Sequence, residues 1–321
     1  MVDPLVRPAE PSEIVWPAPT RVPARRGSAG RASAWHRRTI LISLAPGLVV
    51  LLLFFGVPFV GLIRTSLSTW NGIGDQQFIG MSNYADLLTD PDAYQALGNS
   101  VILGASAAVG VTIIALILGA FVSSNLRGSG IYRVLWFLPS IAPPSAVAVF
   151  WSLSVQPNSG VVNSVLGLLG LGDGHAFLAS ASTALYVVIA VAIWQGVGFA
   201  FLIVLGAMEE VPVSAYEAAA IDGCSPVRRF FSITLPLIRP VLSMVLLLET
   251  IWAFNGFTIV WGMTQGGPGN ATVILPVLVY QDAFLYGTFG PAAALSIVGG
   301  IILLVLGVVG QWFGSRKNPD Q

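Results

Sequence analysis

The sequence predicts an all-α integral membrane protein with six transmembrane helices. Of its 321 residues, 55% are hydrophobic and only 9% are charged, whereas soluble globular chains carry about 25% charged residues. The mean hydropathy is +0.80. Apolar residues also form runs of about 20, long enough to cross a hydrocarbon core as helix. These observations exclude a soluble enzyme, a nucleic-acid-binding domain and a secreted disulfide scaffold.

The first 38 residues differ from the rest of the chain. They contain six prolines and seven arginines but no apolar run, so they do not form a secretory signal. We expect residues 1–38 to be a disordered basic cytoplasmic tail and residues 39–321 to be the transmembrane domain. Nucleic-acid binding is a weaker explanation of the arginines, because basic residues are common before a first span.

Six apolar segments follow the tail, at about residues 40–63, 101–122, 134–153, 184–205, 241–261 and 289–313. Helix is expected because unpaired backbone groups are costly in lipid, and the alternating pattern of a membrane barrel is absent. Pro139, Pro143 and Pro144 should kink or break the third helix. Such a break is tolerated where the helix faces protein or a cavity.

The basic residues predict the orientation of these helices. Six spans place both termini on one side, which then carries 14 of the 15 lysines and arginines, and the opposite side carries only Arg64. The positive-inside rule therefore places both termini in the cytoplasm. On the outer side, residues 82–88 and 91–97 predict two short helices, with Asp90 capping the second and Pro91 at its first position. They could shield the spans or contact an external partner.

Counts of single residue types argue against catalysis by this chain. Cys224 is the only cysteine and the two histidines lie far apart, so neither a disulfide nor a His/Cys metal site is expected. The only lysine, Lys317, is followed by Asn318, so the phosphate-binding motif G-x-x-x-x-G-K-[ST] is absent. We expect no enzyme activity, metal or cofactor here, and any ATP hydrolysis must occur in another chain.

The longest predicted cytoplasmic stretch between spans, about residues 206–240, predicts a helix, a sharp turn and a second helix. Pro212 suits the first turn of the first helix, and Gly223 suits the left-handed position that ends it. Ser225 would cap the second helix, with Pro226 at its first position.

Helical periodicity places Tyr216, Glu217, Ala220 and Ile221 on one face of the first helix. This loop could simply connect two spans. Alternatively, it could dock in a groove of a cytoplasmic partner, with Glu217 pairing to a basic residue there.

The loop also carries a known signature, E-A-A-x3-G-x9-I-x-L-P. The matching residues are Glu217, Ala218, Ala219, Gly223, Ile233, Leu235 and Pro236. The chain therefore resembles the membrane subunits of binding-protein-dependent ABC importers. That resemblance implies the type I importer permease fold in the plasma or inner membrane, with these seven residues coupling the chain to ATPase subunits.

Further motifs resemble the carbohydrate-uptake branch of that family. They are Phe78-Ile79-Gly80-Met81 with Asn83-Tyr84, Phe137-Leu138-Pro139, residues 160–163, Thr264-Gln265-Gly266-Gly267-Pro268 with Thr272, Tyr280, and Ala283-Phe284. The resemblance covers about residues 40–313. It implies a sugar substrate, a second permease subunit, two cytoplasmic ATP-binding subunits and an extracytoplasmic sugar-binding protein. Many sugar permeases have Phe-Asp where this chain has Phe257-Thr258, so the role of that aspartate does not carry over.

Glu249 is the only acidic residue well inside a predicted span. Charged groups at that depth are costly, about 2.5–3.5 kcal/mol on insertion scales, and usually functional. Trp252 shares its predicted helical face, while Asn255 points elsewhere. A sugar offers hydroxyls to a carboxylate and an apolar ring face to an aromatic side chain, so both are candidate pathway residues. Asn255 and Gln195 are weaker candidates, because amides in membrane helices often serve packing.

Two other functions remain as alternatives. One is a permease for a non-sugar solute, and the other is a self-sufficient secondary transporter. Against the second, the six segments show no evident inverted repeat. An intramembrane enzyme is disfavoured because the sequence has no H-E-x-x-H motif and no paired membrane aspartates.

Overall fold

The structure is a computed structural model and describes residues 29–123, 128–172 and 174–315. The chain divides into two units, Met1–Val57 and Pro58–Gln321. In the first unit, helix α1 (Ala29–Leu51) is followed by the π-helical segment η1 (Leu52–Gly56). The last ten residues of the expected tail, 29–38, are therefore helical. That stretch lacks proline and is rich in alanine and arginine, both good helix formers. Residues 1–28 lie outside the described residues.

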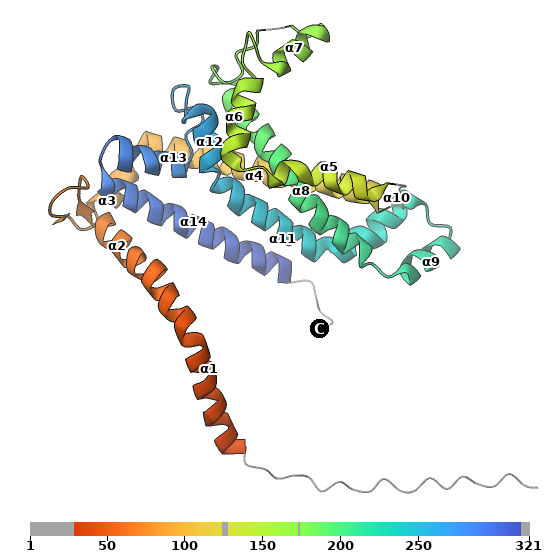
Figure 1. Cartoon of the computed structure of the whole chain (residues 1–321), viewed down its shortest axis with the longest axis horizontal. Coiled ribbons are helices and arrows are strands. Elements are labelled where there is room, and N and C mark those ends of the chain that lie inside the picture. Colours follow the sequence, from red (N-terminus) through yellow and green to blue (C-terminus); the bar gives the residue numbers. More distant parts are fainter. Residues whose placement is uncertain (1–28, 124–127, 173, 316–321) are drawn as a thin grey trace, which may run out of the picture. The chain divides into compact units, whose positions relative to one another are not determined.

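The second unit is built from helices and one small antiparallel sheet (Figure 1). Its helices are α2 (Val57–Ser66, starting at the boundary), α3 (Ser82–Leu87), α4 (Pro91–Val122), α5 (Ser129–Ile141), α6 (Pro144–Ser154), α7 (Val161–Leu168), α8 (Ala184–Glu209), α9 (Val213–Ile221), α10 (Pro226–Arg229), α11 (Leu235–Phe254), α12 (Phe257–Thr264), α13 (Leu275–Tyr280) and α14 (Phe289–Ser315), with π-helical segments η2 (Phe230–Thr234) and η3 (Gln281–Leu285) and strands β1 (Ser68–Thr69) and β2 (Gln77–Phe78). In the sheet, Ser68 pairs with Phe78.

Among the described residues, five helices are long and apolar enough to cross a membrane, and the number is six if one bent pair is counted as a single span. The five are Ile42–Ser66, Pro91–Val122, Ala184–Glu209, Pro226–Phe254 and Phe289–Trp312. The bent pair, α5 and α6, turns by 93°, which confirms the predicted break. Pro143 forces Ala142 into an extended conformation with ψ 135°, so α5 cannot continue.

Two predicted boundaries are wrong. Residues 91–97 are not a separate short helix, because α4 runs without interruption from Pro91 to Val122. Asp90 does cap it, accepting a hydrogen bond of 2.9 Å from the Asp92 amide. Gly98 does not stop the helix, since one glycine costs only about 1 kcal/mol relative to alanine.

The predicted fifth span, residues 241–261, is also misplaced. A helical run begins at Pro226, passes through η2 into α11 and ends at Phe254. The chain turns at Asn255 and Gly256 and restarts as α12, so Trp261 lies in a different helix. Pro240 is accommodated inside α11.

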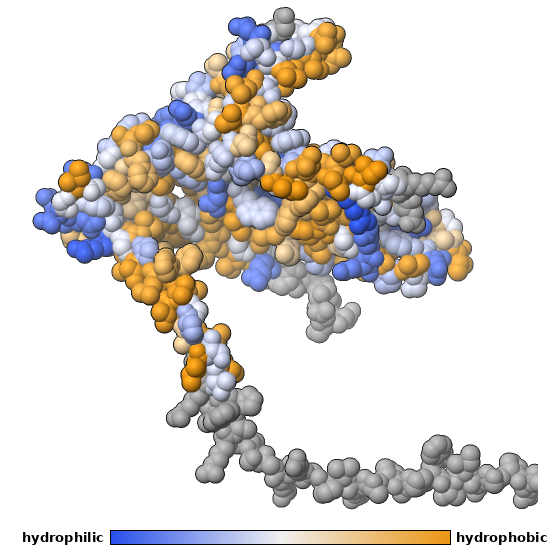
Figure 2. Space-filling model, in the orientation of Figure 1, coloured by the Kyte–Doolittle hydropathy of each residue, from blue (hydrophilic) through white to orange (hydrophobic). Residues whose placement is uncertain are grey.

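The core of the second unit lies between α4, α8 and α11, with α14 packed on α11 and α12 packed on α6. Its largest fully buried side chains include Phe201, Leu103, Leu205 and Ile274. Hydrophobic residues cover much of the helical surface, and hydrophilic residues gather near α3 and near α9, at opposite ends of the bundle (Figure 2). This distribution suits a bundle surrounded by lipid with two polar ends.

Candidate functional site

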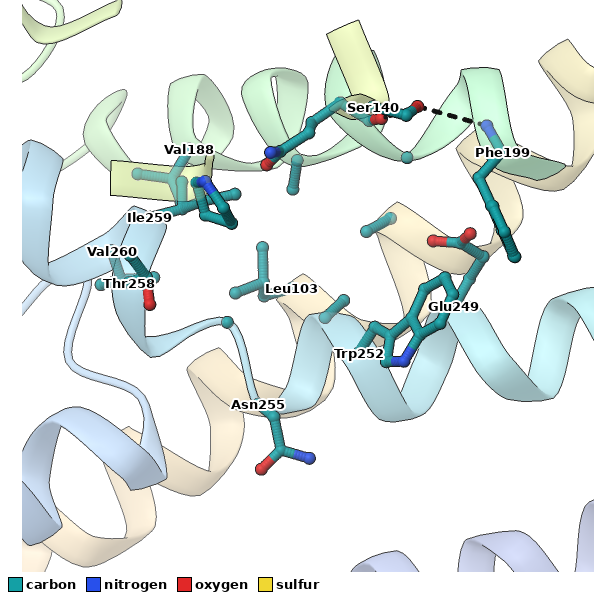
Figure 3. A pocket seen from close by; sticks show the side chains of 17 residues that line it. Leu103, Ser140, Val188, Phe199, Glu249, Trp252, Asn255, Thr258, Ile259 and Val260 are labelled. Carbon is teal, nitrogen blue, oxygen red and sulfur yellow. Dashed lines mark hydrogen bonds between the residues drawn. The ribbon is translucent and has the colours of Figure 1, made fainter. Parts of the chain in front are cut away.

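A cavity of about 420 Å³ lies among α4, α5, α6, α8, α11 and α12 (Figure 3). All four residues that the sequence proposed for a pathway line it: Gln195, Glu249, Trp252 and Asn255. The sequence did not indicate three other polar or aromatic lining residues, Ser140, Phe199 and Thr258, as pathway candidates. The cavity therefore brings together the predicted residues of two separate segments, α8 and the end of α11.

Glu249 is buried, with 5% of its surface exposed. Its carboxylate has no hydrogen-bond partner among the described residues, although it lines the cavity. Directly opposite lies Gly196 of α8, where a Cβ atom would stand 2.9 Å from Glu249 Oε2. A side chain there would collide with the carboxylate, so this glycine creates the space that Glu249 occupies. Sequence reasoning missed Gly196, because only the fold shows what faces it.

An aromatic pair lies beside this carboxylate. The rings of Phe199 and Trp252 have centroids 5.3 Å apart and are tilted by 57°, and Trp252 remains 49% exposed. Asn255 lies in the turn after α11, where its Nδ2 donates a hydrogen bond of 3.0 Å to the Ile251 carbonyl. Figure 3 shows its amide directed away from Glu249. The cavity thus combines a hydrogen-bond acceptor with apolar ring faces.

Gln195 holds the broken end of α5 against α8. Its Nε2 donates a hydrogen bond of 3.1 Å to the Ala142 carbonyl. The Ser140 hydroxyl donates one of 2.6 Å to the Gln195 carbonyl and accepts one of 3.2 Å from the Phe199 amide. The bond to Ala142 satisfies a carbonyl that the break leaves outside the helix. Gln195 therefore has a structural task in addition to its place in the cavity wall.

The loop with the E-A-A signature lies at another part of the bundle. Gly223 has φ +70°, the left-handed conformation expected for it, and the Cys224 amide donates a hydrogen bond of 2.9 Å to the Ala219 carbonyl. Ser225 caps the following helix by accepting a hydrogen bond of 3.4 Å from the Arg228 amide. Glu217 and Ala218 are exposed.

The remaining signature residues Ile233, Leu235 and Pro236 lie in η2 and at the start of α11.

The four residues that periodicity places on one face of α9 differ in burial. Tyr216 is half-buried, and its hydroxyl lies 2.9 Å from the Thr234 hydroxyl. The guanidinium of Arg229 stands 5.1 Å from the centre of its ring. Tyr216 therefore fastens α9 to η2. Glu217, Ala220 and Ile221 are exposed.

A carboxyl group near the start of α4 has a shifted pKa. The pKa of Asp282 is raised from 3.8 to about 6. Burial is the largest cause, and the negative charges of Asp90 and Asp92 contribute to the same rise. Asp92 also accepts a hydrogen bond of 3.1 Å from the Asn270 amide. Within the described residues, no group of three or more His, Cys, Asp or Glu side chains could hold a metal ion.

Comparisons with known proteins agree with this geometry. Residues 111–319 match the family described as "Binding-protein-dependent transport system inner membrane component". The sn-glycerol-3-phosphate transport system permease protein UgpA of Yersinia pestis is 34% identical over 274 residues, covering 85% of this chain and 92% of that protein. The probable ABC transporter permease protein YurN of Bacillus subtilis is 32% identical over 274 residues, covering 84% and 94%.

A solved structure shares the fold. It is the crystal structure of a bacterial ABC transporter involved in the import of the acidic polysaccharide alginate. One of its chains superposes with a TM-score of 0.78 at 21% identity, covering 90% of this chain and 99% of that one.

Proposed function

Because the chain belongs to the family of inner-membrane components of binding-protein-dependent transport systems, we propose that it is one permease subunit of an ATP-driven importer for a sugar or sugar derivative. It is a multi-pass membrane protein and not itself an enzyme. Its partners in this proposal are a second permease subunit, two cytoplasmic subunits that bind and hydrolyse ATP, and an external sugar-binding protein.

One observation carries the proposal. A single helical run, Pro226–Phe254, holds signature residues at one end and cavity residues towards the other. Leu235 and Pro236 begin α11, and Glu249 and Trp252 lie about four turns further along the same helix. A displacement of the loop at the ATPase interface would therefore move the cavity wall directly.

The chemistry of the cavity suits a sugar. The free Glu249 carboxylate can accept hydrogen bonds from hydroxyl groups, and such charge-assisted bonds are the stronger kind. The rings of Phe199 and Trp252 offer apolar faces to a pyranose ring. Mostly apolar walls with a few placed polar groups are typical of small-molecule sites.

A phosphorylated solute is the second candidate, since UgpA is named for glycerol 3-phosphate transport. Against it, no lysine or arginine lines the cavity in the part of the chain that the structure describes. A phosphate would face the Glu249 carboxylate without a counter-charge from this subunit, and like charges repel strongly where water is excluded. The observed cavity therefore favours an uncharged polyhydroxyl solute.

The proposal includes the orientation, with both termini in the cytoplasm, because 14 of the 15 basic residues then lie on that side. A reporter that is active only outside the cell should be silent after Gln321 and active when inserted near Asp75. Activity after Gln321 would contradict the six-span topology.

The function itself is tested on the purified complex of both permeases and the ATPase subunits. Sugar-loaded binding protein should stimulate ATP hydrolysis, and empty binding protein should stimulate it less. If the isolated chain transported sugar in liposomes without ATP, it would be a secondary transporter instead.

A further inference from the structure

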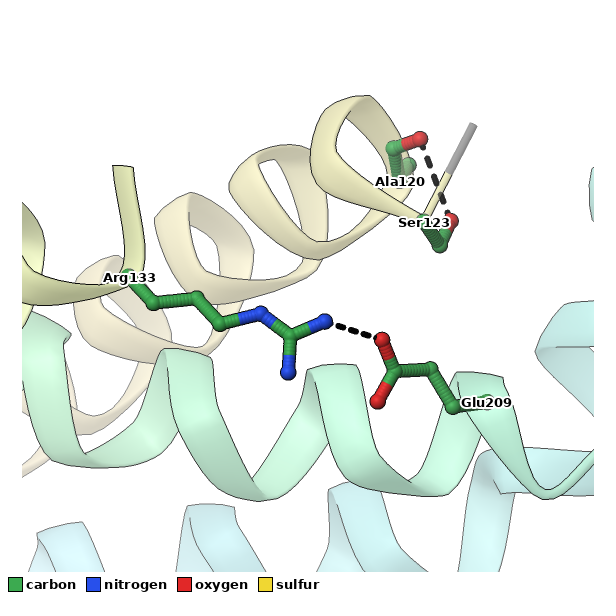
Figure 4. Close-up of polar contacts among 4 residues, drawn as sticks. All are labelled: Ala120, Ser123, Arg133 and Glu209. Atoms are coloured by element: carbon green, nitrogen blue, oxygen red, sulfur yellow. Dashed lines mark hydrogen bonds and ion pairs between the residues drawn. The ribbon is translucent and has the colours of Figure 1, made fainter. Parts of the chain in front are cut away.

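An ion pair joins α5 to the end of α8 that leads into the signature loop. Arg133 Nη2 bonds Glu209 Oε1, and this is the only ion pair among the residues that the structure describes (Figure 4). Arg133 is the fifth residue of α5, and Glu209 is the last residue of α8. Only three residues separate Glu209 from α9, which carries the E-A-A residues. The pair therefore lies where movement of the loop would first reach the helical bundle.

The other end of α5 forms part of the cavity wall. Ser140 lines the cavity, and it lies seven residues after Arg133, about 10 Å along the helix. Ser140 and Ala142 are hydrogen-bonded to Gln195 of α8. The 93° break to α6 follows directly.

Between these two ends, α5 and α8 are in backbone contact. A Cβ atom at Gly198 would lie 2.2 Å from the Trp136 carbonyl oxygen and 2.8 Å from Phe137 Cα. Three attachments along α5 thus hold it to α8: the ion pair, this close contact and the bonds at the break. The ion pair is the attachment nearest the loop.

We propose that Arg133 and Glu209 are positioning residues for coupling: they make α5 follow α8, so that the broken helix at the cavity moves when the signature loop moves. This inference rests on the proposed importer function. Neither side chain touches the cavity, so the pair acts through α5 and not by binding solute.

The partial exposure of the pair argues for a positioning role over a purely stabilising one. The side chains of Arg133 and Glu209 are 38% and 47% exposed, and exposed pairs of this kind contribute about 0–1 kcal/mol to stability. Arg133 Nε is nevertheless buried without a hydrogen-bond partner among the described residues, so this part of the side chain packs against protein although the side chain as a whole is partly exposed. Its geometry is held although the gain in stability is small.

Charge reversal tests the proposal. The variants Arg133→Glu and Glu209→Arg should each lower the stimulation of ATP hydrolysis by sugar-loaded binding protein about fivefold. Their melting temperatures and co-purification with the ATPase subunits should remain close to wild type. The double variant restores opposite charges and should recover most of the stimulation. Glu210→Arg is the matched control: it makes the same charge change one residue later, where no ion pair is found among the described residues, and it should behave as wild type.

Two results would overturn the proposal: single reversals with full stimulation, or a double variant as poor as the single ones. If a reversal prevents folding, the nearly isosteric Glu209→Gln replaces it, and full stimulation in that variant also counts against the pair. Failure of the proposed importer function gives a distinguishable result, because ATP hydrolysis by the wild-type complex would then not respond to the binding protein.

Discussion

Adding one methyl group at Gly196 should damage transport while leaving the fold intact. In Gly196→Ala the new Cβ would lie 2.9 Å from Glu249 Oε2 and 3.1 Å from Val111 Cγ2. Favourable contacts to carbon begin near about 3.5 Å, so the carboxylate must move by about 0.5 Å or rotate. Because it is the end of a flexible side chain, it can do so without shifting α8 or α11.

The effects on stability nearly cancel. Overpacking at this contact costs about 1 kcal/mol, the low end of the usual range, and alanine in place of glycine inside a helix gains up to about 1 kcal/mol. We therefore expect the melting temperature to change by less than about 4 °C. The lost carboxylate–hydroxyl bond is worth about 1.5–3 kcal/mol, which corresponds to a fall in uptake of about 10- to 150-fold.

The assay is uptake of labelled sugar by proteoliposomes that contain the full complex and ATP. Gly206→Ala is the control, because Gly206 is on the same helix and a Cβ there would have no neighbour within 4 Å. It should transport at the wild-type rate. Wild-type uptake by a well-expressed Gly196→Ala complex would refute the view that the position of Glu249 matters for passage of the solute.

Three further predictions concern other parts of the molecule. Glu249→Ala should reduce uptake about tenfold or more while the complex still assembles, as measured by co-purification; normal uptake would exclude a pathway role. Gly223→Asp places a side chain at φ +70°, with a strain of about 1–2 kcal/mol, and should abolish stimulated ATP hydrolysis. Glu217→Lys should do the same, and both variants should still insert in the membrane. If stimulation were retained, the loop would only connect two spans. The raised pKa of Asp282, about 6 instead of 3.8, means that the folded state keeps a proton which the unfolded state loses, so stability falls as pH rises between those values. Asp282→Asn should therefore stabilise the protein at pH 7.5 by about 1 kcal/mol after allowance for solvent screening, seen as a higher melting temperature, and should change it little at pH 4. An equal shift at both pH values would contradict this assignment.

The number of spans could be predicted from the sequence because each span is a local property. Lipid imposes helix on any apolar run of sufficient length, and Pro143 breaks its helix through a steric clash with the preceding residue. Caps are equally local, as Asp90 and Gly223 illustrate. Helix ends are less predictable. The stop at Phe254 is made at the turn dipeptide Asn255-Gly256, which the apolar residues on both sides masked in the predicted span.

The candidate site was predictable only in part. Glu249 was found because a charge at membrane depth is rare and costly. The role of Gly196 depends on which helix faces Glu249, and that is decided by packing between segments more than 50 residues apart. The link between Arg133 and Glu209 is hidden for the same reason. Periodicity places Tyr216 on the same face as Glu217, but the hydrogen bond between the Tyr216 and Thr234 hydroxyls depends on the fold.

The central claim is that one helix connects the signature loop to a solute-binding cavity. Its most direct test is accumulation of the labelled ligand of the binding protein inside ATP-loaded proteoliposomes, comparing the wild-type complex with Glu249→Gln. The wild-type complex should accumulate sugar only with ATP, and the variant should hydrolyse ATP in response to loaded binding protein but accumulate about tenfold less sugar. Equal accumulation by both complexes, or accumulation by the wild type without ATP, would contradict the claim.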